Sequence, residues 1–182
     1  MNKVNLKHYN NDWYNPGTLI KRVCWYVVNI LLFKTGMPWP YSIKCIVLRY
    51  FGAKVGNNVV IKPYVNIKYP WFLEIGNYVW IGEGCWIDSL CKITIGSNVV
   101  ISQGAYLLTG NHDYKSESFD LILKEIILED GVWIGAKSIV CPGVTCKKNS
   151  VLAAGSVATH DLQTNYIYQG NPAKLKRERF PN

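Results

Sequence analysis

This 182-residue chain contains no apolar run long enough to cross a membrane as a helix. Its longest run, from Val23 to Phe33, is about half the length of a spanning helix and contains Asn29. The polar start, MNKVNLKHYNNDWYNPG, has no apolar stretch like that of a secretory signal, so none is expected. The six cysteines include no C-x-x-C pair, and we expect reduced thiols in a cytoplasmic protein.

Charged residues are also scarce, and acidic ones especially so. Only 18% of the residues are charged and 49% are hydrophobic, a composition that supports a sizeable core and disfavours disorder. The 20 lysines and arginines outnumber the 12 acidic residues, which gives a net charge of +8. This excess favours an anionic partner: nucleic acid, an acidic membrane surface or a phosphate-rich cofactor. The sequence has no recognised nucleic-acid-binding motif, so nucleic acid is not expected.

Histidine is scarce too, with only His8, His112 and His160. A zinc lyase of the γ-carbonic-anhydrase type requires three histidines that converge on the metal. The three histidines here lie in the polar N-terminal segment, in mid-chain and beside the C-terminal tail, and we do not expect them to form such a set. The sequence therefore predicts no metal site.

What the sequence does contain is an internal repeat of twenty residues. When Val55, Ile75 and Ile95 are aligned, an aliphatic residue returns every six positions, and the pattern resumes at Leu128 after a break. Thirteen of the fifteen repeated positions are Val, Ile or Leu, which a chance arrangement of strands and turns would not produce. The positions are Val55, Ile61, Ile67, Ile75, Ile81, Ile87, Ile95, Ile101, Leu107, Leu128, Ile134, Val140, Cys146, Leu152 and Ala158.

A six-residue period fits neither a helix nor the two-residue alternation of a strand. It fits a coil with three flat sides, each a short strand and a turn, whose aliphatic residues point inward and stack about 4.8 Å apart on successive coils. Glycine often follows the aliphatic residue, as at Gly76 and Gly135, where we expect a corner with an unusual backbone. We predict a mainly β fold built as a parallel β-helix, with an ordinary β-sandwich as the less favoured alternative.

The repeat resembles that of the hexapeptide-repeat acyltransferases, in which an aliphatic residue is followed by Gly and four more residues. Within that family, the stretches WIDSLCKITIGSNVVISQGAYLLTGNHDY, GVWIGAKSIVCPGVT and GNPAKLKRER are similar to those of colanic-acid-biosynthesis acetyltransferases. Maltose, galactoside and nodulation O-acetyltransferases are similar at a greater distance. The resemblance covers residues 50–180. It implies a left-handed parallel β-helix, whose handedness rests on the family alone.

The chain divides into three parts around this repeat. Residues 1–54 include two predicted helical stretches within 18–52, residues 55–160 form the β-helix, and residues 161–182 form a short basic tail. Residues 108–127 leave the repeat as an inserted loop. The helical part is predicted to cap the open end of the β-helix, which otherwise exposes its core and its strand edges. The alternative is a peripheral membrane contact through 18–52, suited to a lipid-linked acceptor.

Transfer of an acetyl group from a thioester to a hydroxyl needs a base and donors for the oxyanion, but no metal. His112 lies in the insertion, in the sequence TGNHDY, which matches the family's catalytic loop, and we predict it as the general base. A histidine in a surface loop without function is the alternative. Asp88, one coil earlier, is predicted to hold acceptor hydroxyls or to orient the imidazole. Asn111 is predicted to orient the acceptor, although Asn also suits a turn in its own right.

The resemblance also places an acetyl-CoA site. It implies small residues along the groove for the slender pantetheine arm, although such corners favour small residues in any case. It also implies cations in the tail that meet the phosphates of CoA. The residues concerned are Ser102, Trp133, Ala136, Ala154, Thr159, His160, Lys174, Lys176 and Arg177. His160 stands where relatives commonly have lysine, and Trp133 suits plain packing as well as a cofactor contact.

The sequence thus predicts an acetyl-CoA-dependent O-acetyltransferase of cell-surface polysaccharide biosynthesis. Its acceptor is a sugar or glycan that is free, nucleotide-linked or lipid-linked. Transfer to an amine of an amino sugar is the alternative, and a non-catalytic scaffold is a remote one. A homotrimer is predicted, as in the family, because the insertion needs a partner surface to complete a cleft. The expected location is the cytoplasm, with the inner face of the membrane as the alternative.

Overall fold

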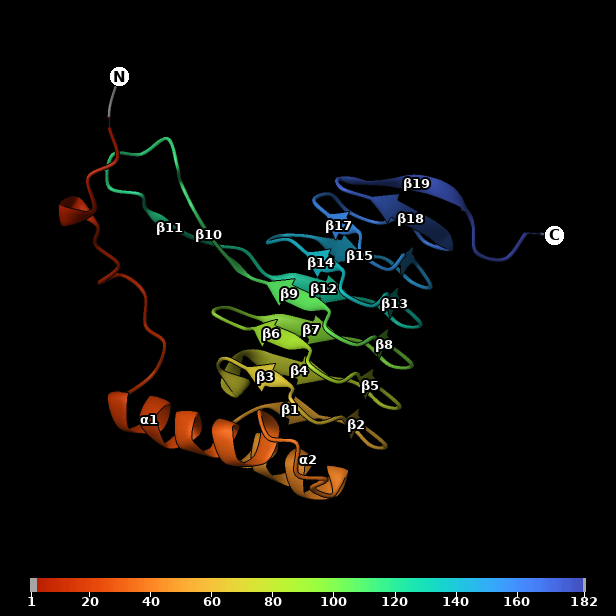
Figure 1. The fold of residues 1–182 in the computed structure, drawn as a ribbon, viewed down its shortest axis with the longest axis horizontal. Helices are drawn as coiled ribbons and strands as arrows, with labels where there is room; N and C mark the ends of the chain where they lie inside the picture. Colours follow the sequence, from red (N-terminus) through yellow and green to blue (C-terminus); the bar gives the residue numbers. More distant parts are fainter. Residues whose placement is uncertain (1–2, 182) are drawn as a thin grey trace.

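The chain folds into a parallel β-solenoid with a helical layer beneath its first coil (Figure 1). The computed structural model describes residues 3–181. Short strands follow one another around three flat faces, and each strand pairs in parallel with its equivalent one coil away. The predicted parallel β-helix is confirmed. No helix in the described part of the chain is both long enough and apolar enough to cross a bilayer.

The strands form three sheets, here called faces A, B and C. Face A contains β1 (Lys54–Val55), β4 (Leu73–Ile75), β7 (Ile93–Ile95), β12 (Ile126–Leu128) and β15 (Thr145–Cys146). Face B contains β2 (Val60–Ile61), β5 (Trp80–Ile81), β8 (Val100–Ile101), β13 (Trp133–Ile134), β16 (Val151–Leu152), β18 (Tyr166–Gly170) and β19 (Ala173–Glu178). Face C contains β3 (Asn66–Ile67), β6 (Trp86–Asp88), β9 (Tyr106–Leu108), β14 (Ile139–Val140) and β17 (Val157–Ala158).

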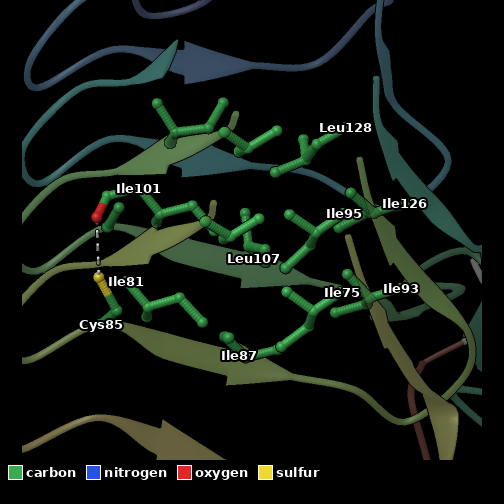
Figure 2. Close-up of a cluster of buried hydrophobic side chains, with 14 of the residues drawn as sticks. Ile75, Ile81, Cys85, Ile87, Ile93, Ile95, Ile101, Leu107, Ile126 and Leu128 are labelled. Carbon is green, nitrogen blue, oxygen red and sulfur yellow. Dashed lines mark hydrogen bonds between the residues drawn. The ribbon is translucent and has the colours of Figure 1, made fainter. Parts of the chain in front are cut away.

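The repeated aliphatic positions stack on one another as predicted. On face A, Val55, Ile75, Ile95, Leu128 and Cys146 are successive pairing partners. The pairing of Ile95 with Leu128 spans the insertion, so the coil resumes in register after it. Figure 2 shows Ile75, Ile95 and Leu128 meeting side chains of the other faces, such as Ile101 and Leu107, inside the solenoid. Each buried side chain of this size contributes about 1.5–3 kcal/mol to folding, so the columns provide most of the core.

The glycines that follow the aliphatic residues provide space, and the expectation of an unusual backbone there is wrong. Neither Gly76 nor Gly135 has a positive φ. A Cβ atom on Gly76 would lie 2.7 Å from the carbonyl carbon of Gly96, and one on Gly135 would lie 2.5 Å from the backbone nitrogen of Ala154. Both contacts are with the next coil, so a side chain would push the coils apart. The positive φ falls two residues later, at Tyr78 (57°).

The helical layer consists of residues 19–50 and covers the start of the solenoid (Figure 1). Helix α1 (Leu19–Val28) begins after Thr18, whose hydroxyl accepts a hydrogen bond from the backbone N–H of Lys21, and it continues into the π-helical segment η2 (Asn29–Phe33). Helix α2 (Tyr41–Tyr50) follows the turn that ends at Pro40. Two short 3₁₀ helices, η1 (Leu6–His8) and η3 (Pro70–Phe72), lie outside this layer.

Lys44 donates hydrogen bonds to backbone carbonyls at the unpaired edge of the first coil. Its side chain is only 1% exposed, and its ammonium donates hydrogen bonds to the carbonyls of Ile61 (3.0 Å) and Lys62 (3.1 Å). These carbonyls lie at the edge of β2, where the next strand of the ladder is missing. Burial lowers the pKa of Lys44, because the charged form loses its hydration.

Other side chains of the helical layer donate hydrogen bonds to the first strands of the other two faces, β1 and β3. Arg49 donates to the carbonyls of Val55 (2.9 Å) and Gly56 (2.7 Å) at β1, and the Trp25 indole donates to the Ile67 carbonyl (2.8 Å) at β3. An unpaired strand edge invites association with another chain. Side-chain donors from one helical layer therefore close all three edges, and the predicted helical cap is confirmed.

The predicted basic tail is largely an antiparallel β-hairpin. Strand β18 joins the end of face B by pairing with β16, and β19 folds back on β18. Tyr168 pairs with Leu152 and is buried above it, so the hairpin covers the last coil. The far end of the solenoid is thus closed by strands, whereas the near end is closed by helices.

Candidate active site

An arm of residues 109–125 leaves the solenoid between β9 on face C and β12 on face A (Figure 1). It is a hairpin in which β10 (Gly110–His112) pairs antiparallel with β11 (Leu121–Leu123). The arm lies inside the predicted insertion, since Leu108 still pairs with Asp88 on face C. It holds His112 away from the coils.

The arm fixes one nitrogen of the His112 ring and leaves the other available. Nδ1 lies 2.9 Å from the carbonyl oxygen of Phe119. A carbonyl can only accept, so Nδ1 carries the proton and Nε2 keeps its lone pair. The Phe119 ring stacks on the imidazole at 4.5 Å with an angle of 6°, and the Tyr9 ring lies 5.8 Å away. The half-buried imidazole is therefore held in one orientation by the arm.

The N-terminal segment, residues 5–14, packs along the arm and is here called the strap. The sequence did not predict this contact. The Asn5 N–H donates to the Glu117 carbonyl (2.8 Å), and the His8 ring lies 3.1 Å from the Glu117 carboxylate. Tyr14 donates to the carbonyl of Leu90 (2.6 Å), which joins the segment to the coil that precedes the arm. The only available signal was the presence of aromatic residues in a polar stretch, HYNNDWYNPG.

Asn111 serves the arm locally. Its side-chain oxygen accepts a hydrogen bond from the backbone N–H of His112 (2.8 Å), and the residue is exposed. This contact lies within β10, between neighbouring residues. The predicted contact of Asn111 with an acceptor stays a prediction.

Asp88 lies at the end of β6 and is half-buried on face C. Burial raises the pKa of its carboxyl, and the ammonium of Lys68 partly opposes this effect. The pKa of Tyr106 is raised as well, first by burial and then by the charge of Asp88, which places the phenol near the carboxylate. Within residues 3–181, no hydrogen bond joins the Asp88 carboxylate to His112.

A cleft of about 430 Å³ lies between α1 and face C, and it reaches β6 at Trp86, two residues before Asp88. Its walls, among the described residues, include the cations Arg22, Lys34 and Lys68 and no acidic residue. Trp86 lines it as well, and its ring stacks on Tyr106 at 4.8 Å and 14°. Arg22 Nε is buried and has no hydrogen-bond partner in the described part of the chain. A cleft with this lining suits a ligand that carries both a ring and an anionic group.

The small residues predicted along the pantetheine groove share one corner of the solenoid. Ser102, Ala136 and Ala154 follow β8, β13 and β16, where the chain turns from face B to face C. The Trp133 indole donates to the Ser102 hydroxyl (2.9 Å) and remains 47% exposed. This corner therefore combines small side chains with a partly exposed aromatic one.

The other residues predicted for CoA lie near the C-terminal end. The hydroxyl of Thr159 lies 2.9 Å from Nδ1 of His160, and both residues are exposed after β17. Lys174, Lys176 and Arg177 are all exposed on β19. The structure thus gathers cations around the last coils, but it does not join them to His112.

Two groups of predicted residues therefore occupy different corners of one protomer. The arm with His112 leaves at the corner between faces C and A, whereas the corner with Ser102 and Ala154 lies between faces B and C. Figure 1 shows the arm leaving at the end of β9, whereas the turn after β8 precedes that strand, so the two corners lie at the two ends of face C. Across residues 3–181 there is also no cluster of His, Cys, Asp and Glu that could hold a metal ion.

Comparison with known proteins identifies relatives along nearly the whole chain. Residues 125–160 match the family model described as the hexapeptide repeat of succinyl-transferase. The chain is 39% identical over 166 residues to the Escherichia coli (strain K12) protein assigned to colanic acid biosynthesis as acetyltransferase WcaF, covering 91% of each. It is 32% identical over 129 residues to the galactoside O-acetyltransferase of the same organism, covering 69% of this chain and 64% of that protein.

A solved structure has the same fold. It is the hexapeptide-repeat acetyltransferase from Vibrio cholerae O1 biovar eltor complexed with acetyl coenzyme A. Its TM-score with this chain is 0.82 at 24% identity, covering 97% of this chain and 96% of that one. At this identity the likeness shows a shared fold.

Proposed function

Since this chain belongs to the hexapeptide-repeat acetyltransferases, we propose that it transfers an acetyl group from acetyl-CoA to a hydroxyl of a sugar in a cell-surface polysaccharide pathway. The observation that carries the proposal is the His112 imidazole, whose Nδ1 is held by the Phe119 carbonyl and whose Nε2 is free to accept a proton. The names of the two relatives, one of colanic acid biosynthesis and one of galactosides, support a sugar acceptor.

In the proposed reaction, His112 Nε2 removes the proton as the acceptor oxygen attacks the thioester carbonyl. A C–O bond forms, the C–S bond breaks, and the proton passes from the imidazolium to the CoA thiolate. No metal and no covalent enzyme intermediate are required, since the thioester is already activated. The protonated imidazole keeps its Nδ1–H bond to Phe119 throughout, which holds the ring in place for both proton transfers.

We propose that acetyl-CoA lies along the corner between faces B and C. Ser102, Ala136 and Ala154 leave clearance for the pantetheine arm, and the exposed face of Trp133 covers it. Among the exposed cations of β19, Lys174 lies at the end of β18 nearest this corner and Arg177 lies further along face B, and we propose that they meet the phosphates.

The acceptor is proposed to bind in the cleft between α1 and face C. Trp86 offers an aromatic surface for a sugar ring, and the half-buried carboxylate of Asp88, two residues further along β6, would accept hydrogen bonds from hydroxyls that extend beyond Trp86. The cations Arg22, Lys34 and Lys68 favour an acceptor that carries a phosphate or a carboxylate. A nucleotide-linked or lipid-linked sugar has this chemistry.

A homotrimer is proposed because one protomer does not complete the site. The arm of one subunit, lying over the corner of the next, would bring His112 to the thioester of the bound acetyl-CoA. Cyclic assembly of this kind repeats one heterologous contact three times and closes on itself.

The test is a thiol-release assay with acetyl-CoA and a panel of phosphorylated and plain sugars, with and without chelator. Hydroxyl acceptors should release CoA and gain one acetyl ester by mass spectrometry, and chelator should have no effect. Products acetylated only on amines would favour N-acetyl transfer. Release that stops with chelator and returns with zinc would overturn the proposed mechanism.

A further inference from the structure

The helix formed by α1 and η2 carries two apolar stripes. One faces the coils and is made by Trp25, Val28, Asn29, Leu32 and Phe33. The other faces away and is made by Leu19, Ile20, Val23, Tyr26, Val27, Ile30 and Leu31, which are all exposed. Their spacing of three and four residues places them on one side of the helix. A surface helix of a globular protein normally has only the inward stripe, so the outward one requires an explanation.

Helix α2 extends this apolar surface. Lys44 and Leu48 are buried against the coils, whereas Ile46 and Tyr50 point away and are 62% and 86% exposed. The outer side of the helical layer is therefore apolar over both helices, and it lies across the end of the solenoid (Figure 1). Large exposed apolar patches mark contact with a protein or with a membrane.

The charge of the chain is concentrated at the same end. Residues 13–73 contain eight lysines and arginines and no aspartate or glutamate. The rest of the chain contains twelve of each sign, so this segment holds the whole net charge of +8. Lys44 is buried, and the other cations of the segment lie at the surface around the layer.

We propose that the outer surface of the helical layer docks in the plane of an anionic lipid bilayer. The partner must be apolar and negative, and the interface of a bilayer with anionic lipids is both. Face-to-face contact with a second copy would bring two surfaces of the same positive charge together, which disfavours self-association there. The helices lie in the interface without crossing it.

The cleft between α1 and face C opens next to this surface. Leu19, Val23 and Tyr26, at the edge of the outward stripe, line it together with Lys68 and Trp86 of the coils. Docking therefore brings the mouth of the cleft to the level of the lipid headgroups. On the proposed function, this favours a sugar linked through phosphate to a membrane lipid, although membrane binding itself does not depend on that function.

The experiment is sedimentation of the full chain with vesicles, without acetyl-CoA or acceptor. Vesicles of phosphatidylcholine with phosphatidylglycerol should bind the protein, binding should fall as salt is raised, and phosphatidylcholine alone should bind much less. I20E/L31E places two charges on the stripe and should lower the partition coefficient by about tenfold or more. L175E/F180E is the matched control, since it makes the same change at exposed apolar residues of the far end and should bind as the wild type does.

Circular dichroism, thermal unfolding and light scattering establish that both variants fold and assemble like the wild type. The proposal is overturned if the wild type does not bind anionic vesicles, or if I20E/L31E and L175E/F180E lose vesicle binding equally. It is also overturned if I20E/L31E changes the assembly size while vesicle binding is absent, because the stripe is then a contact between copies. Neither Ile20 nor Leu31 lines the cleft, so acetyl transfer to a soluble acceptor tests the proposed function separately.

Discussion

At the scale of single residues, the proposed mechanism depends on how a backbone carbonyl fixes the ring of His112. The Phe119 carbonyl holds Nδ1 of His112, and the stacked Phe119 ring limits its rotation. A loop histidine without function would have no reason to be held on two sides. This arrangement orients Nε2 before the acceptor arrives, so that little reorganisation is needed in the transition state.

Replacement of His112 by alanine should lower turnover by about 10²–10⁴-fold, the usual contribution of a general base. The KM for acetyl-CoA should change little, since the imidazole acts on the acceptor proton. Steady-state kinetics on any acceptor that supports turnover measure both constants. His8→Ala is the control, because it removes only an exposed pair with Glu117 and should leave turnover within about twofold. A folded His112→Ala protein with near-normal turnover would rule out the mechanism.

Asp88→Asn should stabilise the protein at neutral pH. Burial raises the pKa of Asp88, so the folded chain binds this proton more tightly than the unfolded chain does. The ionised carboxylate therefore destabilises the fold above its raised pKa, and this cost vanishes as the pH falls below the ordinary value of 3.8. Urea unfolding should show a variant more stable than the wild type at pH 7, with the difference shrinking in acid.

The same substitution should raise the KM for the acceptor and leave that for acetyl-CoA unchanged. Asp12→Asn, at an exposed carboxylate, is the control and should change neither stability nor kinetics. If Asp88→Asn instead destabilises the fold at neutral pH, the carboxylate makes a net favourable contact in the folded state, and its role as a group reserved for the acceptor is contradicted.

At the scale of elements, side chains of the helical layer hold it to the coils by donating hydrogen bonds to carbonyls at the unpaired strand edges. Lys44→Met should lower the free energy of unfolding by about 1–3 kcal/mol, because the carbonyls of Ile61 and Lys62 lose their partner inside the protein. Since burial lowers the pKa of Lys44, the cost of burying its charge is relieved as the pH rises toward 10.5. The advantage of the wild type over Lys44→Met should therefore grow at alkaline pH. Equal stability of the two proteins in urea would show that these bonds contribute nothing.

The coils could be predicted from the sequence because their inward residues recur at a fixed spacing. Ile95 and Leu128 are 33 positions apart in sequence, yet the hexapeptide register alone made them equivalent, and they pair. The role of the glycines was misjudged, because spacing shows where a side chain is absent but not what occupies its place. At Gly76 the next coil occupies it.

The surroundings of His112 could not be predicted in the same way. The motif identified the residue, but its partners Phe119 and Tyr9 come from an arm and a strap that lie outside the repeat. The role of Lys44 could not be predicted for a related reason. In sequence it resembles any lysine beside an apolar run, and only its position at an unpaired strand edge makes it a buried hydrogen-bond donor.

At the scale of the whole molecule, the two ends of the solenoid differ in chemistry. The start is covered by an apolar, positively charged helical layer, and the far end by the hairpin β18–β19, which continues face B. The arm projects sideways between them (Figure 1). A side-by-side assembly of subunits would leave the helical layer free at one end of every prism, so the proposed trimer and the proposed membrane docking use different surfaces.

The proposed sharing of the site between subunits predicts complementation between two inactive variants. His112→Ala removes the base, and Ala154→Trp fills the groove at an exposed corner position, so each protein alone should be inactive. When the two are co-expressed, random trimers place an intact arm against an intact corner at about a quarter of the sites, and up to about a quarter of wild-type activity should return. Mixing the separately purified trimers under conditions without subunit exchange should return none, and light scattering should give three chains per particle. If the whole site lay within one protomer, no combination of these subunits could be active, and co-expressed protein without activity would show that His112 serves the corner of its own chain.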